Sequence, residues 1–276
     1  MQTSLGRRWV GALLFALVLT AGTGQAQTLD RRHMTWNVGT INPFSFRLPK
    51  RREGRVVERL ALHGADTVTL QELRDVAQVQ RLKDGLLAQG HDYAFETFQN
   101  NPSRNDGRLV ATFYKGEQLA QRLEFRSSAG YGALGLQFQS GWTLVNVHAP
   151  AGFYTPRRVY FQELATWIDG LQGKVVLAGD LNLGPRHGAG IGAFLPWARR
   201  YDRDTYAAFI THFDEYTDVG STTFYGFHLD HVLVRGGVIR SAQRFKGYGR
   251  LPMDHRPVLA ELQLGQTTGI TGTLTG

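Results

Sequence analysis

Six short polar patches recur along the chain, each just beyond a run of apolar residues. They are Trp36-Asn37, Gln71-Glu72, Asn146-Val147-His148, Gly179-Asp180-Leu181-Asn182, Leu229-Asp230-His231 and Met253-Asp254-His255-Arg256-Pro257. Because open α/β sheets bind ligands beyond the ends of their strands, several such patches in one domain predict a single convergent site. That site would combine carboxylate, amide and imidazole groups.

Three of these residues offer oxygen ligands for a hard cation. Glu72 and Asp254 carry carboxylates at expected strand ends, and Asn37 adds an amide oxygen. Oxygen ligands of this kind suit Mg²⁺ or Mn²⁺ better than zinc. We therefore predict a site for Mg²⁺, with Mn²⁺ or Ca²⁺ as alternatives. Such an ion would neutralise the oxygens of a phosphate ester during its cleavage.

The other polar residues predict the groups that such a cleavage needs. Asp230 and His255 form a plausible carboxylate–imidazole pair, in which the acid fixes the ring tautomer and supports the imidazolium. Asp180 and Asn182 share one face of a strand that runs into a loop. We expect Asp180 to orient the attacking water, Asn182 to donate to a phosphoryl oxygen, and His148 to add a second donor opposite.

Each residue alone also has a structural explanation. An asparagine often bonds its own backbone in a turn, an aspartate often caps a helix, and a lone glutamate is often solvated. The repeated order of apolar strand and polar end in six patches favours the functional interpretation.

The elements that must position these residues alternate between strands and helices. We expect strands at 33–37, 67–71, 111–114, 142–148, 175–180, 231–234 and 257–262, and helices at 51–63, 75–88 and 156–170. Strands without intervening helices cluster between Tyr93 and His148, which predicts antiparallel pairing there and argues against a purely doubly wound sheet. The expected fold class is α/β.

This series of motifs resembles the endonuclease/exonuclease/phosphatase superfamily, and its secreted deoxyribonucleases in particular, from Met34 to about Leu262. The resemblance implies a four-layer α/β sandwich, in which two mixed β-sheets pack face to face with helices outside. It also implies metal-dependent phosphoester hydrolysis at one edge. The roles it implies agree with those above. Asn37, Glu72 and Asp254 would form the metal region, and Asp180 and Asn182 would act on the water and the transition state. His148 and His255 would contact the phosphate, and Asp230 would support His255.

Some positions depart from the family pattern. Met253 stands where a serine often precedes the last Asp-His pair. Deoxyribonucleases of the pancreatic type place a glutamate near 109–114 to support the first histidine, whereas Arg108 stands there in this chain, with Asp106 as the nearby acid. Those proteins also carry disulfides, and this chain has no cysteine.

Residues 1–26 have the pattern of a secretory signal: Arg7 and Arg8, an apolar run over 9–19, then small and polar residues up to Ala26. An uncleaved membrane anchor is the alternative, but it requires ~20 apolar residues. We expect cleavage near Ala26 and an exported protein, periplasmic or secreted. Residues 27–264 would form the catalytic domain, and the low-complexity tail 265–276 is expected to be disordered.

The charge of the chain favours an anionic partner. The sequence has a formal net charge of +8. Nucleic acid, an anionic lipid surface and a phosphorylated head group would all suit a basic protein, and so would simple solubility. The absence of cysteine excludes thiol catalysis and cysteine-ligated zinc.

Three features of the expected loops bear on the substrate. A basic run follows the first strand and contains Arg47, Lys50, Arg51, Arg52 and Arg55. Arg104 and Arg108 lie in a turn-rich loop, and Phe224 stands where nucleases of the superfamily often present an aromatic ring. A solvated helix start and core packing are the structural alternatives for the basic run and for Phe224.

We therefore predict a metal-dependent endonuclease that acts on DNA with little sequence specificity, as a monomer without a protein partner. The alternative is a secreted lipid or head-group phosphohydrolase, sphingomyelinase-like or directed at phosphoinositides. Its expected sign is an exposed apolar loop, for which 191–197 is a candidate, although a buried short helix is the more economical account of that segment. A binding protein that has lost turnover is disfavoured, because the set of acids and histidines is complete.

Overall fold

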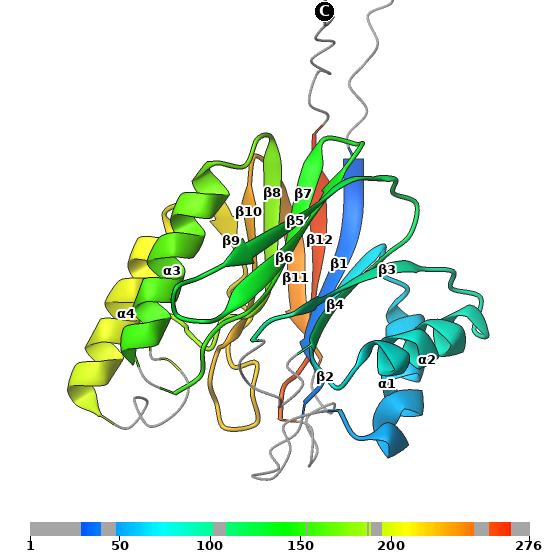
Figure 1. The fold of residues 1–276 in the computed structure, drawn as a ribbon, viewed down its shortest axis with the longest axis horizontal. Coiled ribbons are helices and arrows are strands. Elements are labelled where there is room, and N and C mark those ends of the chain that lie inside the picture. Colours follow the sequence, from blue (N-terminus) through cyan, green and yellow to red (C-terminus); the bar gives the residue numbers. More distant parts are fainter. Residues whose placement is uncertain are drawn as a thin grey trace, which may run out of the picture.

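The structure is a computed structural model that describes residues 29–39, 48–101, 109–152, 154–186, 188, 195–245 and 254–265. Two six-stranded β-sheets pack face to face, with helices on the outer face of each (Figure 1). The predicted four-layer α/β sandwich is therefore confirmed. The predicted signal at 1–26 and the tail from 266 onward lie outside the described residues.

The first sheet holds one parallel pair at its centre. From edge to edge its strands are β11 (Val238–Arg244), β12 (Val258–Leu264), β1 (Leu29–Asn37), β2 (Thr67–Leu73), β4 (Leu109–Tyr114) and β3 (Ala94–Gln99). β1 and β2 are parallel and the other neighbours are antiparallel. A parallel pair needs a crossover, which is supplied here by the short 3-10 helix η1 (Lys50–Arg52) and α1 (Glu53–His63).

The second sheet repeats this plan. Its order is β5 (Leu119–Arg126), β6 (Gly132–Phe138), β7 (Trp142–His148), β8 (Lys174–Asp180), β10 (Asp230–Arg235) and β9 (Glu215–Tyr216). β7 and β8 are parallel and are joined by α3 (Tyr154–Asp169). The antiparallel pairing predicted between Tyr93 and His148 is confirmed by β3 with β4 and by β5 with β6 and β7.

The remaining helices complete the outer layers. α2 (Val76–Leu87) lies beside α1 over the first sheet, and α4 (Pro196–Ile210) lies beside α3 over the second (Figure 1). Three buried apolar clusters fill the spaces between the layers: one under α1 and α2, one under α3 and α4, and one between the sheets. No helix among the described residues is long and apolar enough to span a membrane.

Buried polar side chains fix how the sheets meet. Gln71 Nε2 donates to Asn146 Oδ1 at 2.9 Å across the two sheets, and Asn146 Nδ2 donates to the Ala111 carbonyl oxygen at 2.9 Å. Because unmade hydrogen bonds in a buried interface are costly, these bonds specify one alignment of the sheets. That alignment sets the positions of the strand ends described next.

Candidate active site

The predicted site residues lie at one edge of the sandwich, where both sheets contribute strand ends. Asn37 ends β1, Glu72 lies near the end of β2, and His148 and Asp180 end the parallel strands β7 and β8. His148 pairs with Asp180, which in turn pairs with Asp230, the first residue of antiparallel β10.

The carboxylate of Asp180 joins the two halves of the site. Its Oδ2 accepts from Asn37 Nδ2 at 2.9 Å and lies 3.8 Å from the Nε2 atoms of both His148 and His255. Its Oδ1 accepts from the backbone N–H of Asn182 at 2.8 Å. A water placed among these groups would contact a carboxylate and two imidazoles at once.

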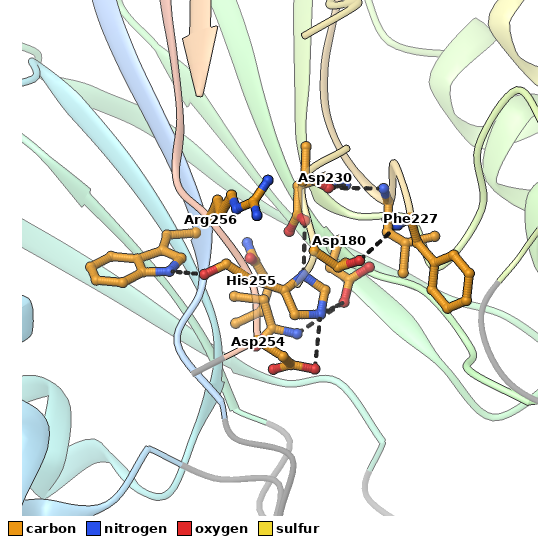
Figure 2. A network of polar contacts seen from close by, with 12 residues as sticks. Asp180, Phe227, Asp230, Asp254, His255 and Arg256 are labelled. Carbon is orange, nitrogen blue, oxygen red and sulfur yellow. Dashed lines mark hydrogen bonds and ion pairs between the residues drawn. The ribbon is translucent and has the colours of Figure 1, made fainter. Parts of the chain in front are cut away.

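His255 and Asp230 form the predicted carboxylate–imidazole pair, with His255 Nδ1 2.8 Å from Asp230 Oδ2. Figure 2 shows the ring between Asp230 on one side and the carboxylates of Asp180 and Asp254 on the other. Burial opposes the charged ring, but Asp230 and Asp180 raise the pKa of His255 well above 6.5. The ring is therefore a cation at neutral pH and suits contact with a phosphoryl oxygen.

Glu72 belongs to the first sheet and lies close to His148 of the second sheet. Glu72 Oε1 lies 3.5 Å from His148 Nε2. Burial raises the pKa of Glu72 to about 8, although His255 and Asn37 favour its charged form. Burial also raises the pKa of Asp254. Without a bound cation, the surroundings of Glu72 and Asp254 therefore favour the protonated form of each carboxyl group.

Unusual backbone geometry surrounds the site. Glu72 and Asn182 are the non-glycine residues with positive φ in the described part of the chain, at 61° and 48°. Such conformations persist where the surroundings enforce them and cluster at functional sites. At Gly179 a Cβ would collide with the Val147 carbonyl oxygen, so the tight contact of β7 with β8 requires glycine.

The donor set fits a hard divalent cation. Glu72, Asp254 and the Asn37 amide provide oxygen donors beside Asp180 and Asp230, and Asp230 Oδ1 is buried without a hydrogen-bond partner among the described residues. Ligand atoms of Asp180, Asp230 and His255 also lie within 4.8 Å of one another. So many carboxylates in one buried space call for positive charge, which one ion would supply.

Comparisons with known proteins agree with this arrangement. The model of the endonuclease/exonuclease/phosphatase family matches residues 34–245. The chain belongs to this family. It is therefore a phosphoester hydrolase, in a family whose members generally depend on divalent metals.

Solved structures share the fold at low sequence identity. An endonuclease/exonuclease/phosphatase from Bacteroides vulgatus is 20% identical with a TM-score of 0.66, over 86% of this chain and 99% of that one. ANGEL2, a 2′,3′-cyclic phosphatase, is 17% identical with a TM-score of 0.62, over 86% and 96%. A mannosyl-6-phosphatase from Bacteroides thetaiotaomicron is 16% identical with a TM-score of 0.62, over 84% and 99%. No curated protein sequence matches this chain.

The side chain of Asn182 makes a structural hydrogen bond in addition to the catalytic role expected of it. Its Nδ2 donates to the Ala149 carbonyl oxygen at 2.9 Å, which ties the loop after β8 to the residue after β7. A side-chain amide has two N–H groups, so one is left for a phosphoryl oxygen. The predicted role of Asn182 in the transition state stays a prediction.

The substrate-contacting candidates are only partly described. Arg104 and Arg108 lie outside the described residues, as do Asp106 and Met253. Phe224 is 53% exposed, and its backbone N–H donates to the Asp254 carbonyl oxygen at 2.7 Å. Core packing is thereby excluded for Phe224, and its backbone adjoins Asp254 of the hydrolase site.

The suggestion of a buried short helix at 191–197 is wrong where the structure describes that segment. Pro196 begins α4, a helix of 15 residues, and Trp197 is 51% exposed. Residues 191–194 lie outside the described part.

Several supporting residues were missed from the sequence. Thr222 Oγ1 accepts from the backbone N–H groups of Leu229 and Asp230 at 3.0 Å each. Asn100 Nδ2 donates to the His148 carbonyl oxygen at 2.5 Å. Arg157 reaches the Asn182 carbonyl oxygen from α3. Asn100 and Arg157 act on backbone 48 and 25 residues away, and Thr222 acts on backbone seven and eight residues away, contacts for which no short sequence pattern exists.

Proposed function

We propose that this hydrolase is an exported, Mg²⁺-dependent phosphodiesterase that cuts DNA with little sequence specificity. The observation that carries the hydrolytic chemistry is the contact of Asp180 with Asn37, His148 and His255 across the two sheets. The net charge of +8 and the exposed ring of Phe224 support a nucleic-acid substrate.

Bound at Asn37, Glu72 and Asp254, a divalent cation would neutralise phosphoryl oxygens. Asp180 accepts a proton from the attacking water, whose oxygen bonds to phosphorus as the opposite P–O ester bond breaks, and the leaving oxygen takes a proton from solvent. His255, protonated and held by Asp230, donates to a phosphoryl oxygen, and His148 contacts the phosphate from the second sheet. Every group named here belongs to the connected cluster described above.

A phosphorylated head group or membrane lipid is the second candidate substrate. It is favoured by three exposed apolar side chains at the start of α4: Leu195, Trp197 and Tyr201 are 37%, 51% and 46% exposed. An apolar surface of this kind would suit insertion at a lipid interface. It lies on the outer helix layer, whereas Phe224 adjoins the site itself, so DNA is the substrate we favour.

The test is hydrolysis of plasmid DNA, RNA, sphingomyelin and a soluble phosphoinositide by the purified protein, each with Mg²⁺ and with chelator. Nicking of DNA that needs Mg²⁺ and falls steeply with salt is the expected result. Intact DNA together with cleavage of a lipid or head-group ester would replace the proposal by the second candidate. The Asp180→Asn variant controls for contaminating nuclease.

Export is tested separately, by fractionating cells that express the full chain. Processed protein outside the cytoplasm is expected, with a new N-terminus near residue 27. Unprocessed protein in the cytoplasm would refute it.

A further inference from the structure

A cavity of about 370 Å³ lies between the loop after β8 and the loop that leads into β10, beside the catalytic edge. Its walls include Gly184, Arg186, Asp218, Gly220, Ser221 and His228. Gly184 follows Asn182 by two residues, and His228 precedes Asp230 by two. The cavity is therefore lined by residues that adjoin the hydrolytic site in sequence, and its volume suits a group of nucleotide size.

Two arginines outside the lining contact one wall of the cavity through its residue Ser221. Guanidinium groups of Arg244 and Arg256 both donate to the carbonyl oxygen of Ser221, the second at 3.2 Å. Neither has a carboxylate partner within 4.0 Å among the described residues. A guanidinium has five N–H donors, so two such groups on one neutral oxygen keep several donors for another acceptor. Arg186 adds a further, exposed guanidinium on the wall opposite.

A histidine in the cavity wall has an unmet hydrogen bond. The Nε2 atom of His228 is buried and has no hydrogen-bond partner among the described residues. Its ring stacks on His231 with centroids 4.3 Å apart, and His231 is held in turn by the Leu183 carbonyl oxygen 3.0 Å from its Nε2. A rigid, unpartnered polar atom beside guanidinium groups indicates a ligand with oxygen acceptors.

The cavity wall also carries one acidic residue, Asp218, which reduces the net positive charge of the cavity. Asp218 Oδ1 lies 3.9 Å from His228 Nδ1, and the Asp218 side chain is 80% exposed. Its charge is largely screened by solvent. Arg186 in the lining and the two arginines bonded to the lining residue Ser221 outnumber this solvated aspartate, so the cavity suits an anion.

We propose that this cavity binds a second phosphate of the substrate, the backbone phosphate next to the scissile one in a nucleic-acid strand. The inference rests on the proposed function. A nucleic-acid strand carries a phosphate at every nucleotide, so a strand cut at Asp180 and His255 extends past the adjoining loops. The guanidinium groups and His228 supply donors there without reading a base, in keeping with low sequence specificity.

The experiment compares two substrates that differ in the number of phosphates. Thymidine trinucleotide has more than one backbone phosphate, and bis(p-nitrophenyl) phosphate has one. The Arg186→Gln and Arg244→Gln variants of the full chain are expected to lose about tenfold in the ratio of kcat/KM for the trinucleotide to that for the single diester, through KM. Each should also lower the salt dependence of the trinucleotide kcat/KM by about 0.7 in log–log slope.

Arg240→Gln is the matched control, since Arg240 lies on β11 and its one hydrogen bond among the described residues is a solvent-exposed one to Gln263. Arg186→Gln removes no hydrogen bond or ion pair identified among the described residues, so it stays informative if Arg244→Gln fails to fold. If the wild type is active and Arg186→Gln changes the kcat/KM ratio no more than Arg240→Gln does, this inference is overturned while the proposed function stands.

Two other outcomes of the experiment would have different meanings. A wild type that cleaves neither diester in Mg²⁺ refutes the proposed function and this inference with it. A loss in Arg186→Gln that is confined to an inositol bisphosphate, with the trinucleotide unaffected, would assign the cavity to a head-group phosphate and overturn the nucleic-acid occupant.

Discussion

Arg157 on α3 binds Asn182 through the backbone: its Nη1 donates to the Asn182 carbonyl oxygen at 2.5 Å, while its Nε lies 3.1 Å from Asp202 Oδ1 on α4. Arg157 and Asp202 are both buried. Asp202 Oδ2 also accepts from the Gly188 N–H at 3.0 Å. One buried ion pair thus holds the loop after β8, including the left-handed backbone of Asn182.

Arg157→Met is expected to lower the free energy of unfolding by about 3–5 kcal/mol, because it leaves the Asp202 carboxylate buried without its cation. Urea denaturation measures this loss. The double variant Arg157→Met with Asp202→Leu should recover part of it, since both charges are then removed. A double variant less stable than the single one would show that the ion pair is not the source of the effect.

Asp180→Asn and His255→Ala are each expected to reduce phosphodiester hydrolysis by about 10²–10⁴-fold. The first removes the acceptor for the water proton, and the second removes the cation facing the phosphoryl oxygen. Steady-state rates in Mg²⁺ test this, with circular dichroism and thermal melting to show an intact fold. An undiminished rate in either variant would remove that residue from the mechanism.

Metal affinity should rise with pH up to about 8. The raised pKa of Glu72 keeps that carboxyl protonated at neutral pH in the metal-free protein. A cation must therefore displace this proton, so the affinity should increase up to about tenfold per pH unit below that pKa and level off above it.

Calorimetric titration with Mg²⁺ or Mn²⁺ from pH 6 to 9 measures both affinity and proton release. Glu72→Gln should weaken binding and reduce the proton release. An affinity that is flat across this range in the wild type would exclude Glu72 as a ligand that must ionise.

His33 is expected to make the fold sensitive to acid. Its Nδ1 lies 2.9 Å from Thr67 Oγ1 and its Nε2 lies 3.3 Å from Thr69 Oγ1, and burial lowers its pKa from 6.5 to about 3. The unfolded chain binds a proton at this residue from pH 6.5 downward, whereas the folded chain does not. The stabilisation is therefore complete above pH 6.5 and is lost as the pH falls toward 3, on the order of 3–5 kcal/mol.

Urea unfolding at pH 7 and at pH 4 tests this expectation. His33→Gln should show a smaller difference between the two pH values than the wild type. Because His228 and His231 also have lowered pKa values, some acid sensitivity will remain in the variant. Equal pH dependence in the two proteins would contradict the assignment to His33.

The site and the central strands were predictable from sequence because both leave local patterns. His148 and Asp180 each end an apolar run, and Asn37 follows a segment in which Met34 and Trp36 alternate with polar residues, so the expected strands at 33–37, 142–148 and 175–180 lie within β1, β7 and β8. The edge strand β11 was missed because its residues alternate between half-buried and exposed positions without an apolar run.

Other features could not be predicted from the sequence, for a physical reason. α4 has a polar sequence in which Asp202 is buried, and only its contact with Arg157 on a different helix explains that burial. The same holds for Gln71, whose partner Asn146 lies on the other sheet. Pairings across layers depend on tertiary packing, and neither partner's local sequence encodes the other.

The division of the active site between two sheets has a consequence for how activity arises during folding. Asn37 and Glu72 come from the first sheet, and His148, Asp180 and Asp230 from the second. Neither sheet alone contains a working set, so the catalyst first exists when the sheets dock. Hydrolysis thus reports that the two sheets have docked.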